Sequence, residues 1–197
     1  MKTQSLETPI KFLAICGSLR VGSYTDVLVR TLSATIVAEG AVVSVWSLLS
    51  DPLPMANPIY HKEPQNHPDT IVRRFVHLAD AADGFILGSP IYHNSFSGCL
   101  KNSLDLLAMS NTAYKTFGLV SHGGNRSAQA VDQLRIVTRG LLGVAIPTQI
   151  CTSDDDYQFS EDGNSCSIRQ EKLEERVSRF VAEMMAFTRL LKPMRID

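Results

Sequence analysis

The chain has 197 residues, which suits one sizeable domain and is short for two. Hydrophobic residues make up 44% of it and the net charge is −1, so it lacks the composition of a disordered chain. The near-zero charge also argues against broad nucleic-acid binding, and no apolar run is long enough to span a membrane. We therefore expect a single soluble globular domain over residues 1–197.

Cysteine usage and the first residues bear on the compartment. The four cysteines are scattered and form no C-x-x-C pair, as in proteins with reduced thiols. Residues 1–9 are polar and lack the apolar core of a signal peptide. These features predict a cytoplasmic protein. The five histidines show no ligand spacing, so we predict no metal site.

Apolar runs and amphipathic stretches alternate five times along the chain. Strands are predicted at residues 11–16, 42–46, 84–89, 116–121 and 144–150. Helices are predicted at residues 23–39, 69–82, 98–109, 126–141 and 168–191. Two segments show no clear periodicity: residues 48–68, which hold five prolines, and the polar residues 151–165. Long loops such as the first are often functional.

This alternation predicts an α/β domain with a doubly wound parallel sheet. Pro147 lies within the last predicted strand, and a proline is tolerated in a sheet mainly at an edge. The flavodoxin-like strand order 2-1-3-4-5 places the fifth strand at an edge. We therefore predict a five-stranded sheet in that order, with helices on both faces.

The first candidate binding loop follows the first predicted strand. It holds two glycines, Gly17 and Gly22, with Ser18, Arg20 and Ser23 between and after them. Hydroxyls, an arginine and a helix N-terminus together suit a phosphate dianion. The spacing matches neither a Walker loop nor a dinucleotide fingerprint. An ordinary helix cap with a solvated arginine remains the alternative.

Two further loops follow the third and fourth predicted strands. Residues 89–98 are rich in aromatic and polar groups with little charge, which suits a flat ring with hydrogen-bonding edges. Residues 121–126 contain Gly123 and Gly124, which permit close approach to a ligand plane. His122 is consistent with a pocket residue or with a capping residue, and nothing in the sequence supports a role for it as an acid. Each of these two loops, taken alone, is also consistent with an ordinary connection between a strand and a helix.

The three loops lie at the carboxyl ends of neighbouring strands, where open α/β sheets bind ligands. A mononucleotide with a terminal phosphate and a flat ring suits all three, and FMN is the natural candidate. Arg126 and residues 48–68 are candidates for contacting a nicotinamide cofactor, with solvated surface as the alternative.

Three stretches of the chain together resemble the flavodoxin-like NAD(P)H-dependent FMN reductase family. They are Gly17-Ser18-Leu19-Arg20 with Gly22-Ser23, then Ser89-Pro90-Ile91-Tyr92 with Ser95-Phe96-Ser97-Gly98-Cys99-Leu100-Lys101-Asn102, and then Gly123-Gly124. The resemblance covers residues 10–150. It looks closest to flavin reductases that serve two-component monooxygenases, which suggests a monooxygenase partner. Many relatives have Glu-Tyr-Asn after the proline, where this chain has Ile91-Tyr92-His93.

The resemblance implies FMN as cofactor and NADPH or NADH as co-substrate. It implies phosphate contacts from Ser18, Arg20, Ser23, Tyr24 and Thr25. It implies ring and ribityl contacts from Pro90, Ile91, Tyr92, His93 and Asn94, with Ser121, His122, Gly123 and Gly124 on the far side of the ring. It also implies a homodimer or homotetramer that packs through the helix at residues 98–109.

The reaction implied is hydride transfer from NAD(P)H to flavin N5, and on to free flavin, a quinone, an azo compound or a similar acceptor. No catalytic side chain is required, because the flavin carries the chemistry. The alternatives are a non-enzymatic electron carrier or flavin-binding sensor on the same fold, and a phosphate-binding regulatory domain without flavin. Carriers are commonly acidic, so the balance of 19 basic and 20 acidic residues disfavours the first of these.

Overall fold

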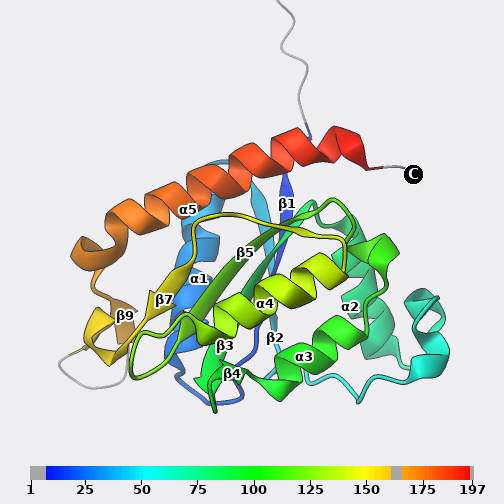
Figure 1. The fold of residues 1–197 in the computed structure, drawn as a ribbon, viewed down its shortest axis with the longest axis horizontal. Coiled ribbons are helices and arrows are strands. Elements are labelled where there is room, and N and C mark those ends of the chain that lie inside the picture. Colours follow the sequence, from blue (N-terminus) through cyan, green and yellow to red (C-terminus); the bar gives the residue numbers. More distant parts are fainter. Residues whose placement is uncertain (1–7, 161–165, 196–197) are drawn as a thin grey trace, which may run out of the picture.

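A twisted parallel sheet forms the centre of the molecule (Figure 1). The computed structural model describes residues 8–160 and 166–195. The parallel strands are β1 (Lys11–Cys16), β2 (Val42–Ser47), β3 (Gly84–Tyr92), β5 (Thr116–His122), β6 (Val144–Ala145) and β7 (Ile150–Thr152). Their order is β2-β1-β3-β5-β6, with β7 also paired to β5. This confirms the predicted flavodoxin-like order 2-1-3-4-5.

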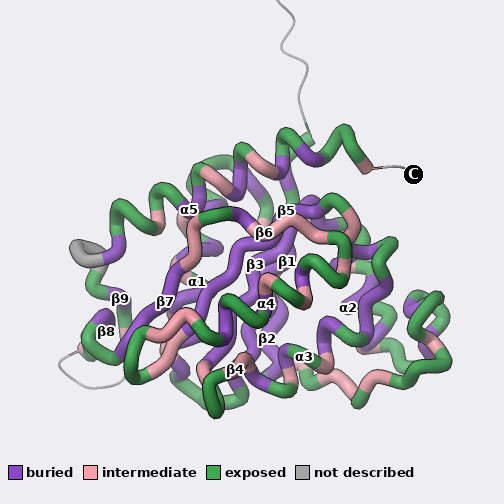
Figure 2. The backbone as a smooth tube through the Cα atoms, in the orientation of Figure 1, coloured by how far each residue is buried: buried purple, intermediate pink, exposed green. Residues whose placement is uncertain are grey.

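Helices cover both faces of the sheet (Figure 1). They are α1 (Tyr24–Ala38), α2 (Thr70–Ala81), α3 (Gly98–Asp105), α4 (Gln129–Gly140) and α5 (Gln170–Leu191). Successive side chains of a strand point to opposite faces. Phe12 and Ala14 of β1 accordingly pack with α1 and α5, whereas Leu13 and Ile15 pack with α2, α3 and α4. Both faces of β1, β3 and β5 are therefore buried, as Figure 2 shows.

The fifth predicted strand is interrupted, which corrects the expectation of one strand over residues 144–150. β6 pairs with the start of β5 and β7 with its end, and Pro147 lies in the gap between them. Proline has no N–H to donate to a ladder, so a break at this position is physically reasonable. The guanidinium of Arg135 donates to the carbonyls of Ile146 and Pro147, at 2.9 and 3.0 Å. These two bonds fix the backbone between β6 and β7.

The two segments without periodicity contain short elements. Residues 48–68 hold the 3₁₀ helices η1 (Pro58–Tyr60) and η2 (Pro64–Asn66), and Asn102 of α3 bonds to the backbone of Pro54 and Ala56. Residues 151–165 were expected to be irregular. They contain the end of β7, η4 (Asp154–Asp156) and β8 (Tyr157–Phe159), which pairs with β9 (Cys166–Ile168). The remaining short elements are β4 (Ser95–Phe96), η3 (Met109–Asn111) and η5 (Lys192–Met194).

Helix boundaries shift by a few residues from those predicted. α4 begins at Gln129 rather than at residue 126, because Arg126 has a φ of 47°, in the left-handed region that a right-handed helix excludes. All four cysteines are free thiols. Within residues 8–160 and 166–195, no helix is long and apolar enough to cross a membrane. Most of the polar N-terminal segment, residues 1–7, lies outside the described residues.

Candidate functional site

The loop from β1 to α1 presents hydrogen-bond donors at the carboxyl edge of the sheet. Ser23 caps α1: its hydroxyl accepts from the N–H of Asp26 at 3.0 Å. Gly22 has a φ of 65°, which glycine adopts without strain. Ser18 is buried, and its hydroxyl accepts from the N–H of Arg20 at 3.3 Å. The loop is therefore folded on itself while the Arg20 side chain extends into solvent.

This loop has several properties of an anion site. The N–H groups of Tyr24 and Thr25, at the first two helical positions, donate to no acceptor within the described chain, as expected of a helix start. Asp26 is the only acid of the first turn, and Arg30 binds its carboxylate at 2.7 Å. Free donors and a neutralised acid together favour an incoming phosphate.

Residues 90–94 extend β3 and turn in a tight hairpin, whereas the sequence predicts a strand that ends at residue 89 and a loop after it. Pro90, Ile91 and Tyr92 belong to β3, which turns through His93 and Asn94 into β4. Both turn residues have positive φ, 48° and 64°, as in a type I′ turn. The side chain of Gln133 on α4 donates to the Asn94 carbonyl at 2.8 Å. The hairpin tip is exposed and Tyr92 has 52% of its surface in solvent.

The three predicted loops are held against one another. Ser97 donates its hydroxyl hydrogen to the Gly17 carbonyl at 2.6 Å and joins the first loop to the start of α3. Gly123 lies against Ile91: a Cβ at Gly123 would stand 2.9 Å from the Ile91 Cδ1 atom. The loops after β1, β3 and β5 therefore form one surface.

Two predicted hydroxyls are covered. Thr25 is 1% exposed and lies over Gly88 of β3, and Ser121 is fully buried with its hydroxyl 3.4 Å from the Ser127 carbonyl. Tyr24 directs its ring toward His122 and Tyr157, with centroid distances of 4.6 and 4.3 Å. The Tyr24 side chain thus takes part in an aromatic cluster, while its backbone N–H stays at the helix start.

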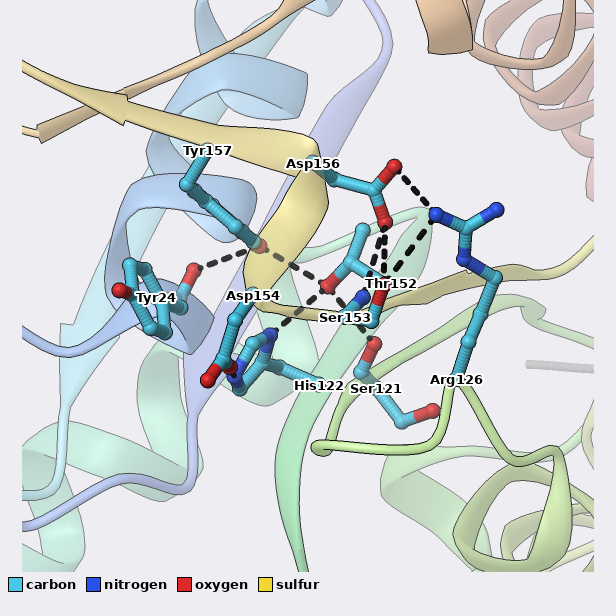
Figure 3. A network of polar contacts seen from close by, with 9 residues as sticks. All are labelled: Tyr24, Ser121, His122, Arg126, Thr152, Ser153, Asp154, Asp156 and Tyr157. Carbon is cyan, nitrogen blue, oxygen red and sulfur yellow. Dashed lines mark hydrogen bonds and ion pairs between the residues drawn. The ribbon is translucent and has the colours of Figure 1, made fainter.

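A polar network links the loop after β5 to the segment after β7 (Figure 3). The Thr152 hydroxyl lies 3.2 Å from His122 Nδ1 and 2.9 Å from the Tyr157 hydroxyl. Tyr157 donates to the Tyr24 carbonyl at 3.1 Å, and Asp154 lies 3.2 Å from His122 Nε2. Burial lowers the pKa of His122, while the neighbouring carboxylates oppose this change. His122 therefore stands inside a bonded cluster at the site.

The acidic residues of η4 were not among the predicted site residues. Arg126, a candidate for the nicotinamide cofactor, instead places its guanidinium 2.6 Å from the buried carboxylate of Asp156 and 3.2 Å from the Ser153 hydroxyl. The signal was present in the sequence, since residues 151–156 follow the fifth predicted strand and so lie at the same carboxyl edge. In the described ranges, no group of three or more His, Cys, Asp or Glu side chains is arranged to hold a metal ion.

The fold defines a flavodoxin-like protein, and its three joined loops place the free donors of residues 17–25 on the same surface as the β3–β4 hairpin and Gly123. A sequence model of the NADPH-dependent FMN reductase family matches residues 10–157, and the chain belongs to this family. It is an FMN-dependent NAD(P)H oxidoreductase, which confirms the predicted cofactor and the enzyme class over a carrier or a regulatory domain.

Curated relatives agree with the family assignment. The FMN-dependent NADPH-azoreductase of Staphylococcus aureus is 36% identical over 184 residues, which cover 90% of this chain and 95% of that protein. The FMN-dependent NADPH-azoreductase of Staphylococcus haemolyticus is 34% identical over 179 residues, with the same two coverages.

Solved structures support the fold. The flavoenzyme NAD(P)H:(acceptor) oxidoreductase FerB of Paracoccus denitrificans superimposes with a TM-score of 0.72 at 19% identity, covering 92% of this chain and 98% of that one. The apo form of the NADH:FMN oxidoreductase EMOB gives a TM-score of 0.64 at 22% identity, covering 92% and 90%.

Proposed function

We propose that the enzyme reduces azo compounds, and quinones of similar shape, with electrons from NADPH. The observation that carries the proposal is the packing of the three loops: Ser97 bonds to Gly17 at the start of the proposed anion-binding loop, residues 17–25, and Gly123 lies against Ile91. The two curated relatives named above are azoreductases that match nearly the whole chain, which supports an azo acceptor.

The residues of the first loop fit an FMN phosphate. Arg20 supplies an exposed guanidinium, and Tyr24 and Thr25 supply backbone N–H groups without a protein partner in the described chain. A phosphate dianion accepts hydrogen bonds from all of these, and the α1 dipole adds to them. Ser18 and Ser23 already bond within the loop, so their part is to shape it as well as to donate their hydroxyl hydrogens.

The ring is proposed to lie on the surface that the β3–β4 hairpin and the loop after β5 form together. Pro90, Ile91, Tyr92, His93 and Asn94 border one side, and Ser121, His122, Gly123 and Gly124 the other. When bound, FMN supplies hydride chemistry at its N5 atom. The hairpin contributes rigidity: its turn is tied to α4 through Gln133, so ring and acceptor meet fixed walls.

Three finer assignments belong to the same proposal. The enzyme works in the cytoplasm as a homodimer or homotetramer, and a flavin-dependent monooxygenase is a second destination for its electrons. Free cysteines agree with a reducing compartment. Size-exclusion chromatography with light scattering tests the assembly.

The function is tested by steady-state oxidation of NADPH by the purified protein, with and without added FMN, using methyl red, a benzoquinone and free flavin as acceptors. We expect FMN-dependent NADPH oxidation with decolourisation of methyl red. A parallel series with NADH gives the nicotinamide preference. FMN-dependent oxidation with free flavin alone would overturn the azo acceptor, and none with any acceptor would overturn the proposed function.

A further inference from the structure

The side chain of His122 lies between two hydrogen-bonding partners at the end of β5. Its Nδ1 atom is 3.2 Å from Thr152 Oγ1 and its Nε2 atom is 3.2 Å from Asp154 Oδ1 (Figure 3). Only 13% of the His122 side chain is exposed, and the rings of Tyr24 and Tyr157 stand 4.6 and 5.3 Å away, centroid to centroid. Both ring nitrogens are thus engaged within a covered cluster.

The number of hydroxyl hydrogens limits which hydrogen bonds this network can form. The Tyr157 hydroxyl donates to the Tyr24 carbonyl, which can only accept. Thr152 has one hydroxyl hydrogen and three acceptors within reach: the Ser121 carbonyl at 3.2 Å, the Tyr157 oxygen at 2.9 Å and His122 Nδ1 at 3.2 Å. The direction of this single hydrogen determines what His122 can do.

Two protonation states fit the same positions of His122, Asp154 and Thr152. In the neutral state, His122 carries its hydrogen on Nε2 and donates it to Asp154, while Thr152 donates to Nδ1. In the protonated state, Nδ1 donates to Thr152 and Nε2 to Asp154, and Thr152 turns its hydrogen to the Ser121 carbonyl. The two states differ by one proton on Nδ1 and by the rotation of the Thr152 hydroxyl hydrogen.

The charged and titratable groups around His122 lie in η4, the loop after β1, α1 and β8. Asp154 and Asp156 of η4 favour a proton on the ring, and Asp156 is already paired with Arg126. Arg20 of the first loop and the burial of the ring oppose it. Tyr24 of α1 and Tyr157 of β8, whose pKa values are both raised, stay neutral beside it. An added negative charge at the site shifts this balance toward the proton.

We propose that His122 is a proton-binding residue of the FMN site, which takes up a proton between Thr152 and Asp154 when a negatively charged ligand occupies the loop after β1. This inference rests on the proposed function, because it takes FMN as the ligand. By linkage, FMN binding and proton uptake by His122 strengthen each other equally.

The test is a pH titration of the His122 ring signals by NMR in the full-length protein, assigned with a His122→Gln variant. We expect Asp154→Asn and Thr152→Val each to move the His122 midpoint to lower pH, because each removed partner binds the charged ring more strongly than the neutral ring. Asp155→Asn makes the same charge change on an exposed neighbour and leaves the midpoint unchanged. An Asp154→Asn midpoint equal to that of the wild type, or no His122 titration before unfolding, would overturn the inference.

Saturating FMN is the second arm of the same titration. We expect it to raise the His122 midpoint in the wild type. If FMN binds and the midpoint does not move, the inference fails while the proposed function stands. If FMN does not bind at all, the proposed function fails, and with it the place of His122 in an FMN site.

Discussion

The guanidinium of Arg126 lies 2.6 Å from the carboxylate of Asp156, a residue with no exposed surface. The same carboxylate accepts the backbone N–H of Ser153 at 2.8 Å. The pair fastens the loop after β5 to η4, so two loops that border the site share one anchor. Arg126 is held in this position with a left-handed backbone.

Replacing Arg126 with alanine leaves the buried Asp156 charge with fewer donors. We expect Arg126→Ala to lower the free energy of unfolding by about 2 kcal/mol, since removing one partner of a buried charge is costly. Arg179→Ala is the matched control, because its partner Glu175 is exposed, and it should change stability by less than about 0.5 kcal/mol. Urea unfolding measures both, and equal losses would contradict this account.

Gly123 and Gly124 offer a second matched pair. A Cβ at Gly123 would meet Ile91 at 2.9 Å, whereas a Cβ at Gly124 would meet nothing within 4 Å. Gly123→Ala therefore forces the β3–β4 hairpin away from the loop after β5. We expect Gly123→Ala to lower the free energy of unfolding by about 1–3 kcal/mol, with Gly124→Ala close to the wild type in unfolding free energy. Urea unfolding measures both, and equal losses for the two variants would contradict the close contact between Gly123 and Ile91.

Arg20 is the charged side chain of residues 17–25, the loop that we propose binds the FMN phosphate. Arg20→Ala should weaken FMN binding by about tenfold to a hundredfold, the value of a charge-assisted hydrogen bond to phosphate. Arg139→Ala, at the end of α4, removes an exposed arginine outside that loop and should leave the affinity unchanged. Fluorescence titration of FMN measures both, and an Arg20→Ala protein with wild-type affinity would rule out the phosphate role.

Stability is expected to rise with pH in the alkaline range because of Lys115. Burial, with repulsion from Arg195, lowers the pKa of Lys115 to about 8, although Asp80 and Asp83 favour the charge. Between about pH 8 and the usual lysine value near 10.4, the unfolded chain binds the proton that the folded protein has lost. Raising the pH through this range therefore stabilises the folded protein relative to Lys115→Met. Urea unfolding at several pH values should show the difference growing by up to about 3 kcal/mol, and a constant difference would contradict the shift.

Much of this site could be predicted because its residues sit where strands end. The apolar run before Gly17 predicts a buried strand, and Ser23 has the chemistry of a helix cap, so the position of the loop at residues 17–25 follows from local sequence. The strand order was predicted from the alternation of strands and helices along the chain, together with Pro147, which favours an edge position for the last strand. The break in the strand at Pro147 was not predicted, because it depends on Arg135 of α4, which donates hydrogen bonds to the carbonyls of Ile146 and Pro147.

The polar network could not be predicted in the same way. It depends on Tyr24, His122 and Thr152, which are far apart in the chain and meet only once β1, β5 and β7 are aligned. The turn at His93 and Asn94 was missed because it lacks glycine, which usually marks a type I′ turn. From the sequence alone, Asp156 would be expected on the surface, as most aspartates are, and its pairing with Arg126 explains why it is buried.

The central claim is that the loop of residues 17–25 holds the phosphate of FMN. Calorimetric titration of the wild-type protein with FMN and with riboflavin, which lacks only that phosphate, tests it most directly. We expect FMN to bind about 100-fold more tightly, as two charge-assisted hydrogen bonds predict. Equal affinities for the two flavins would contradict the account.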